Sequence, residues 1–165
     1  MHTLQIIISR TDTMVGKTIR VFTHEKLNHC AIALDKDYDR VYSFTRRYEH
    51  FFFTGCFCTE PLERYADYEI AEIVLSDKEY LRIKKFLSAL NKKFRIYDFP
   101  GIIFTGLQIK HYQPKYHYIC STFAAKILDL TDSVRLKKDV NLYKPMDVHD
   151  LIKNKIIVKA KILNK

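Results

Sequence analysis

The sequence predicts a single α+β domain over residues 1–165, with a central antiparallel sheet and one cysteine-bearing helix packed on it. Segments in which apolar and polar residues alternate, separated by polar turns, indicate strands. Segments with apolar residues at helical spacing, introduced by capping residues, indicate helices. With 47% apolar and 13% aromatic residues, the chain can bury one globular core.

The strand signals lie mainly in the first half of the chain. Strands are expected at residues 4–8, 28–35, 41–46 and 68–75. Because the polar segment 36–39 separates the second from the third, we expect these two to form an antiparallel hairpin, which brings Ser43 near His29. Residues 48–65, which include three consecutive Phe residues, are expected to be irregular, either packed as a loop or lining an apolar groove.

The helix signals are capping residues followed by a one-sided apolar stripe. Helices are expected at residues 77–92, 102–109 and 121–130, and a short one is expected after Asp12 or Thr13. Ser76 caps the first of these, with Glu79 at the capping-box position. Pro100 and Gly101 open the next, whose run Ile102–Phe104 is expected to pack in the core, with contact to a lipid-like substrate as the alternative.

The chemistry-bearing residues are a histidine on a strand and a cysteine at a helix start. The first turn of a helix lowers the pKa of a thiol, and a thiolate is the reactive nucleophile, so Cys120 is well placed. Strand alternation puts His29, Ala31 and Ala33 on one face, where small side chains would let the Cys120 helix approach the imidazole. Cys30 lies on the opposite face and is the poorer nucleophile candidate. The plain alternative is that both residues are ordinary buried side chains.

These motifs resemble the circularly permuted NlpC/P60 papain-like superfamily, which includes the YiiX-like bacterial proteins and the lecithin:retinol acyltransferase-like enzymes. In that group the strand histidine precedes the helix-borne cysteine. The resemblance rests on the runs Asn28-His29-Cys30-Ala31-Ile32-Ala33-Leu34-Asp35, Val41-Tyr42-Ser43-Phe44-Thr45-Arg46 and Tyr118-Ile119-Cys120-Ser121-Thr122-Phe123-Ala124. It extends to the end of the chain, where Lys144-Pro145-Met146-Asp147 precedes a short helix and a last strand, residues 155–160.

The third catalytic residue departs from the pattern that the resemblance implies. Members of the superfamily use a polar residue, often His, Glu or Gln, on the strand after the first histidine, and Ser43 is the nearest positional match here. The bacterial versions also carry a glycine where this chain has Thr45. Either Ser43 orients His29, or another group such as Asn28, Glu60 or a water does so, or the site is impaired.

The resemblance implies a cysteine peptidase-like hydrolase or an acyltransferase that acts on an amide, isopeptide, ester or thioester bond. Cys120 would be the nucleophile, His29 the base and Ser43 the third member, with no cofactor and no metal. A peptide, a peptidoglycan-derived molecule or a lipid-like acyl compound would be the substrate. The alternative is a non-enzymatic basic binding protein on the same fold, docking on a membrane surface or a nucleic acid.

The charge and the cysteine content limit the partners and cofactors that the protein is expected to have. The net charge of +9 predicts either a solvated basic surface or attraction to anionic polymers and lipid head groups, and no nucleic-acid motif is present. The four cysteines include one close pair, Cys56 and Cys58, whose spacing is a poor zinc signal. The start of the chain lacks a signal-peptide pattern, and no transmembrane segment is visible, so a cytoplasmic location is expected.

Overall fold

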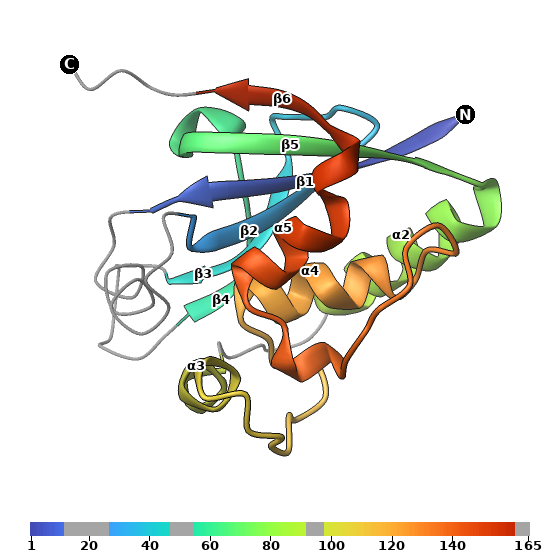
Figure 1. Cartoon of the computed structure of the whole chain (residues 1–165). Helices are drawn as coiled ribbons and strands as arrows, with labels where there is room; N and C mark the ends of the chain where they lie inside the picture. Colours follow the sequence, from blue (N-terminus) through green and yellow to red (C-terminus); the bar gives the residue numbers. More distant parts are fainter. Residues whose placement is uncertain (12–26, 47–54, 92–97, 161–165) are drawn as a thin grey trace.

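The computed structural model describes residues 1–11, 27–46, 55–91 and 98–160 of the chain. Within these ranges the protein is an α+β structure built on one six-stranded sheet with the strand order β4-β3-β2-β1-β5-β6 (Figure 1). The strands are β1 (His2–Arg10), β2 (His29–Leu34), β3 (Val41–Arg46), β4 (Gly55–Glu60), β5 (Ala66–Leu75) and β6 (Ile156–Ala160). Every neighbouring pair in this sheet is antiparallel.

Helices surround one face and one end of this sheet. The α-helices are α2 (Asp77–Asn91), α3 (Phe99–Gly106), α4 (Cys120–Leu128) and α5 (Pro145–Ile152), and the short 3₁₀ helices are η1 (Leu62–Arg64), η2 (Val140–Leu142) and η3 (Lys153–Lys155). Figure 1 shows α4 and α5 lying over the sheet and α3 set apart from it at one end of the molecule. None of the described helices combines the length and the apolar character needed to cross a membrane.

Strand β1 lies inside the sheet because both of its faces are buried. Leu4, Ile6 and Ile8 point into the larger hydrophobic cluster, whereas Ile7 points into a second cluster on the other face. All four side chains are at most 1% exposed. The face of Ile7 also carries the buried polar side chains of Gln5 and Ser9, and a strand with two buried faces belongs in the interior of a covered sheet.

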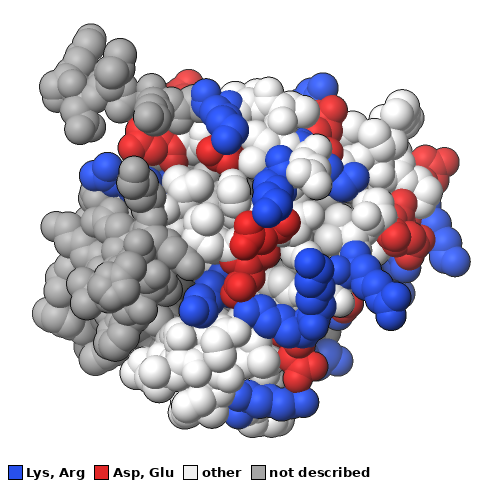
Figure 2. Space-filling model, viewed as in Figure 1, with Lys and Arg blue, Asp and Glu red and all other residues white. Residues whose placement is uncertain are grey.

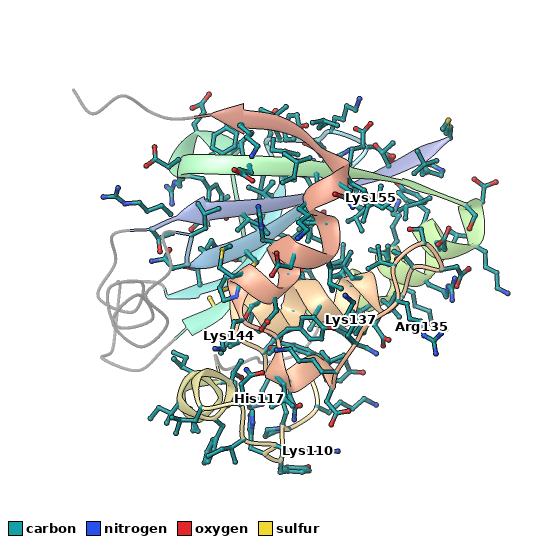
Figure 3. The ribbon with its side chains drawn as sticks, in the orientation of Figure 1. Lys110, His117, Arg135, Lys137, Lys144 and Lys155 are labelled. Carbon is teal, nitrogen blue, oxygen red and sulfur yellow. The ribbon has the colours of Figure 1, made fainter. Side chains whose placement is uncertain are left out.

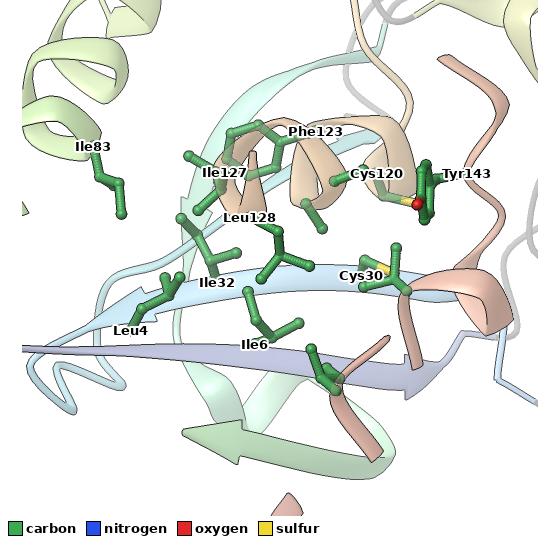
Figure 4. Close-up of a cluster of buried hydrophobic side chains, with 14 of the residues drawn as sticks. Leu4, Ile6, Cys30, Ile32, Ile83, Cys120, Phe123, Ile127, Leu128 and Tyr143 are labelled. Carbon is green, nitrogen blue, oxygen red and sulfur yellow. The ribbon is translucent and has the colours of Figure 1, made fainter. Parts of the chain in front are cut away.

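The larger cluster fills the space between the sheet and α4. Figure 4 shows Cys30 and Ile32 on β2 below Cys120, Phe123 and Ile127 of α4. Phe123 is fully buried and contacts an aromatic group formed by Phe44, Phe57 and Tyr118. The buried side chains of this cluster include Leu4, Ile6, Ile8, Cys30, Ile32, Phe44, Ile73, Ile83, Leu90, Cys120, Phe123, Ile127, Leu128, Tyr143 and Val148.

Several predictions about local structure are confirmed. The Ser76 backbone N–H donates to the Glu79 carboxylate at 2.7 Å, and the Glu79 backbone N–H donates back to the Ser76 hydroxyl at 3.3 Å, which is the expected capping box of α2. Strands β2 and β3 pair as the expected antiparallel hairpin, with Ile32 opposite Tyr42. The last strand and the short helix before it are also present as β6 and α5.

Two predictions differ from the structure. Residues 55–60, expected to be irregular, form β4, because Phe57 and Cys58 can bury against β3 while Thr59 faces solvent. Helix α3 begins at Phe99, before its predicted start, because the Asp98 carboxylate accepts a hydrogen bond from Gly101 N at 3.0 Å and caps the helix there. The short helix predicted after Asp12 or Thr13 and the run Phe51–Phe53 lie outside the described residues.

Candidate functional site

Cys120 is the first residue of α4, as the sequence predicts. Thr122, two residues further on, accepts a hydrogen bond from the backbone N–H of Ile119 at 3.1 Å and so closes the start of the helix. Cys120 is not part of a disulfide and is 1% exposed. The unpaired N–H groups of the first helical turn surround its backbone, a position that favours a thiolate or an oxyanion.

His29 is the first residue of β2, and its side chain is hydrogen-bonded to that of Ser43 on the adjacent strand. Its Nε2 atom lies 2.9 Å from the Ser43 hydroxyl, and that hydroxyl donates to the carbonyl oxygen of Cys30 at 3.1 Å. A serine hydroxyl has only one proton, so Ser43 must accept the proton on Nε2 of a neutral His29. The network therefore assigns the free lone pair of the imidazole to Nδ1, the nitrogen that can act as a base.

Burial controls the charge of His29. The side chain is 7% exposed, and desolvation lowers the pKa of the imidazole to about 4. At neutral pH the ring is therefore uncharged. An uncharged imidazole can accept a proton from a thiol, whereas a resting thiolate–imidazolium pair, which needs a charged ring, is disfavoured.

The sequence prediction about the faces of β2 is wrong for the small residues. Ala31 and Ala33 pack in the second cluster, and α4 packs instead against the face that carries Cys30, Ile32 and Leu34. Strand β2 is buried on both sides, so alternation separates its two faces without saying which one meets the helix. The larger side chains bury more apolar area against α4 than two alanines could.

As a result, the three predicted site residues fall into two groups. His29 and Ser43 are brought together by the β2–β3 hairpin, as expected. His29 stacks on Tyr65, which belongs to the second cluster, whereas Cys120 packs in the larger cluster together with Cys30 (Figure 4).

Tyr65 is a site residue that sequence reasoning missed. Its ring stacks on the His29 imidazole with centroids 5.5 Å apart and an angle of 19° between the planes. Burial raises the pKa of the Tyr65 hydroxyl, the charges of Glu60, Cys58 and Cys120 raise it further, and the nearby Ser43 hydroxyl lowers it. No described residue gives the Tyr65 hydroxyl a well-formed hydrogen bond.

A third hydroxyl completes the polar surroundings of His29. Ser9 lies directly opposite His29 in the β1–β2 pairing, so the two side chains share one face of the sheet. The Ser9 hydroxyl is fully buried and has no hydrogen-bond partner among the described residues. Nothing in the local sequence marks Ser9 or Tyr65, because a lone serine near a strand end and a lone tyrosine in a short connecting segment are common.

The other orienting candidates are engaged elsewhere. The Asn28 side chain binds Thr11, accepting from its backbone N–H at 2.8 Å and donating to its carbonyl at 3.0 Å, which joins the ends of β1 and β2. Glu60 lies 3.6 Å from Arg64 in an ion pair. Among the described residues, no three His, Cys, Asp or Glu side chains gather as a metal site would require.

A second buried polar network holds the segment before Cys120. The Asp98 carboxylate lies 3.3 Å from His111 Nε2 and 3.5 Å from Gln113 Nε2. Gln113 also donates to the Thr122 hydroxyl of α4 at 3.3 Å. Because Asp98 caps α3 as well, this network links the start of α3 to the first turn of α4.

Comparisons of the chain with protein-family models, with curated proteins and with solved structures find no match.

Proposed function

We propose that this protein is a thiol hydrolase or acyltransferase on a permuted papain-like domain, acting on an amide, isopeptide, ester or thioester carbonyl. Cys120 is the nucleophile, His29 the base, and Ser43 holds the imidazole in the tautomer that leaves Nδ1 free. The proposal extends the sequence resemblance by adding Tyr65, whose ring stacks on the His29 imidazole.

The observation that carries this proposal is the group of buried hydroxyls near His29, at the edge of the second hydrophobic cluster. The second cluster consists of aliphatic side chains and Tyr65, yet three hydroxyls, from Ser9, Ser43 and Tyr65, surround one neutral imidazole. Two of these hydroxyls are buried without a partner among the described residues. Buried polar groups left unpaired cost stability, so such a group fits a functional role better than a structural one.

The chemistry follows from the charge states of these groups. Because Cys120 and the His29–Tyr65 pair pack in different clusters, the thiol proton passes through a water molecule to His29 Nδ1 as the sulfur attacks the carbonyl carbon. The first-turn N–H groups of α4 stabilise the oxyanion that forms. The carbon–heteroatom bond then breaks, and the proton on His29 passes to the leaving amine, alcohol or thiol. Water or an acceptor molecule, deprotonated by His29, then attacks the carbonyl carbon of the thioester. The acyl–sulfur bond breaks, and Cys120 is released.

The test is an acylation burst measured with p-nitrophenyl acetate as the probe ester. Wild type should release nitrophenol in a burst and carry one acetyl group on Cys120 by peptide mass spectrometry, with Cys30, Cys56 and Cys58 unmodified. His29→Gln keeps a hydrogen-bonding group beside Ser43 but lacks a base, and it should lose the burst by a factor of about 100 or more. Cys56→Ser, at a partly exposed thiol, is the matched control and should behave as wild type.

Two results would contradict the proposal. One is acetylation of Cys56 or Cys58 at the same rate as Cys120. The other is an unchanged burst in His29→Gln when circular dichroism shows that the variant is folded, because Cys120 would then react without the proposed base.

A further inference from the structure

Helix α3 and the segment after it present large apolar side chains to solvent. Ile103, Leu107 and Ile109 are 57%, 59% and 49% exposed, Phe104 is 38% exposed and Tyr112 is 87% exposed. The other exposed large apolar residues of the described chain are Met1 and single or paired residues on β5, α2 and β6. The prediction that the run Ile102–Phe104 packs in the core is confirmed for Ile102, which packs against the larger cluster, and wrong for Ile103 and Phe104. We call the five side chains of residues 103–112 the α3 patch.

The α3 patch is held in place by hydrogen bonds on its inner side. Thr105, which is 2% exposed, donates to the Asn141 carbonyl at 2.8 Å. Gln108 donates to the Leu142 carbonyl at 3.0 Å, and Asn141 donates to the His111 carbonyl at 2.8 Å. These contacts fasten α3 to η2 through its polar residues, which leaves the apolar residues facing outward.

Basic side chains lie beside the α3 patch. Figure 2 shows Lys and Arg side chains across the face next to the white surface of α3. In Figure 3, Lys110 and Lys144 lie nearest α3, and Lys137 and then Arg135 continue the same face away from α3 toward α2. Lys110 pairs with Asp139 at 2.8 Å. Within the described part of the chain, Arg135, Lys137 and Lys144 form no ion pair, so their charges are available to a partner.

The geometry points to a docking surface for an anionic phospholipid bilayer, made by the α3 patch and the neighbouring basic residues Arg135, Lys137 and Lys144. The apolar side chains insert into the boundary between head groups and acyl chains, with Tyr112 at the level of the head groups. The three unpaired cations bind lipid phosphates around the inserted helix. This docking does not depend on thiol chemistry at Cys120.

The combination of side chains favours a bilayer over other anionic partners. A nucleic acid is recognised by cations and by aromatic stacking, and these interactions do not require three exposed aliphatic side chains on α3 and the segment after it. Aliphatic side chains that stand out from the surface match the soft boundary of a bilayer, and the adjacent cations match its negative charge. Both features are needed, so binding should require anionic lipid and fall as salt is raised.

The experiment uses a tryptophan as the probe, because the chain contains none. Leu107→Trp reports on the α3 patch, and Leu81→Trp, at a 65% exposed position on α2, is the matched control. Vesicles of phosphatidylcholine mixed with phosphatidylglycerol should shift the emission of Leu107→Trp to the blue and leave that of Leu81→Trp unchanged. Vesicles of phosphatidylcholine alone should have little effect on either protein.

Co-sedimentation with the same vesicles separates the two contributions. Ile103→Ser combined with Leu107→Ser should weaken binding by about tenfold or more, since it removes two inserting side chains. Arg135→Glu combined with Lys137→Glu should weaken binding to the anionic vesicles to a similar degree. Lys84→Glu combined with Lys85→Glu on α2 makes the same change of charge and should bind as wild type.

Any of three results would overturn the inference. Wild type could stay in the supernatant with anionic vesicles, or the α2 control variants could lose binding as strongly as the α3 variants. Binding to a DNA duplex that survives Ile103→Ser combined with Leu107→Ser, in the absence of vesicle binding, would assign the basic surface to nucleic acid instead. Cys120→Ser should bind vesicles as wild type does, which separates this inference from the proposed chemistry.

Discussion

The buried imidazole of His29 should make the protein lose stability as the pH falls through the range from about 6.5 to about 4. Desolvation lowers the pKa of this group from 6.5 to about 4 in the folded protein. Between these values the unfolded chain binds a proton at this position and the folded protein does not. Stability from the neutral imidazole is therefore fully present above pH 6.5, declines as the pH drops, and reaches its full loss near pH 4.

The magnitude follows from the size of the shift. One pKa unit corresponds to 1.36 kcal/mol, so the shift corresponds to a loss of about 3 kcal/mol by pH 4 and about 2 kcal/mol at pH 5. The free energy of unfolding should be measured by urea titration at several pH values for wild type and for His29→Gln. Carboxylates whose pKa is lowered, such as those of Asp35, Glu69 and Glu79, also weaken the protein in acid, but they do so equally in both proteins.

The quantity to follow is therefore the difference in unfolding free energy between wild type and His29→Gln. We expect this difference to shift against wild type by about 2 kcal/mol between pH 7.5 and pH 5. A difference that stays constant with pH would show that His29 titrates normally. A difference that shifts in favour of wild type as the pH falls would show that the imidazole is charged in the folded protein, as in a resting ion pair with a thiolate.

Three further predictions concern the hydroxyls around His29 and the cap of α2. Ser43→Ala removes the acceptor for the buried imidazole N–H and should lower the free energy of unfolding by about 1–3 kcal/mol, with a modest loss of Cys120 acylation; unchanged values of both would remove Ser43 from the site. Tyr65→Phe removes a buried hydroxyl without a well-formed hydrogen bond, so urea unfolding should show stability equal to or above that of wild type, and a loss above about 1 kcal/mol would reveal a partner for the hydroxyl. Glu79→Ala removes the carboxylate that accepts from the N–H groups of Ser76 and Asp132, and its thermal unfolding should show a loss of about 1–2 kcal/mol; a negligible change would mean that water replaces the cap.

The candidate site was partly predictable because short-range sequence patterns place some of its residues. The turn between β2 and β3 made the pairing of His29 with Ser43 predictable, and the change from irregular sequence to a helical stripe placed Cys120 at the start of α4. Tyr65 could not be found in this way. It reaches His29 from the segment between η1 and β5, and only the packing of that segment on the sheet brings the two rings together.

The sequence by itself determined the class of the fold, the order of most strands and helices, the capping box of α2 and the short-range contacts within the β2–β3 hairpin. These features depend on side-chain periodicity and on residues a few positions apart, and both can be identified directly in the sequence. The tertiary structure alone decided which face of β2 meets α4, because both faces are apolar and the choice depends on total buried area. It also decided that the apolar residues of α3 face solvent, because polar contacts from Thr105 and Gln108 to η2, more than 30 residues away, fix the rotation of that helix.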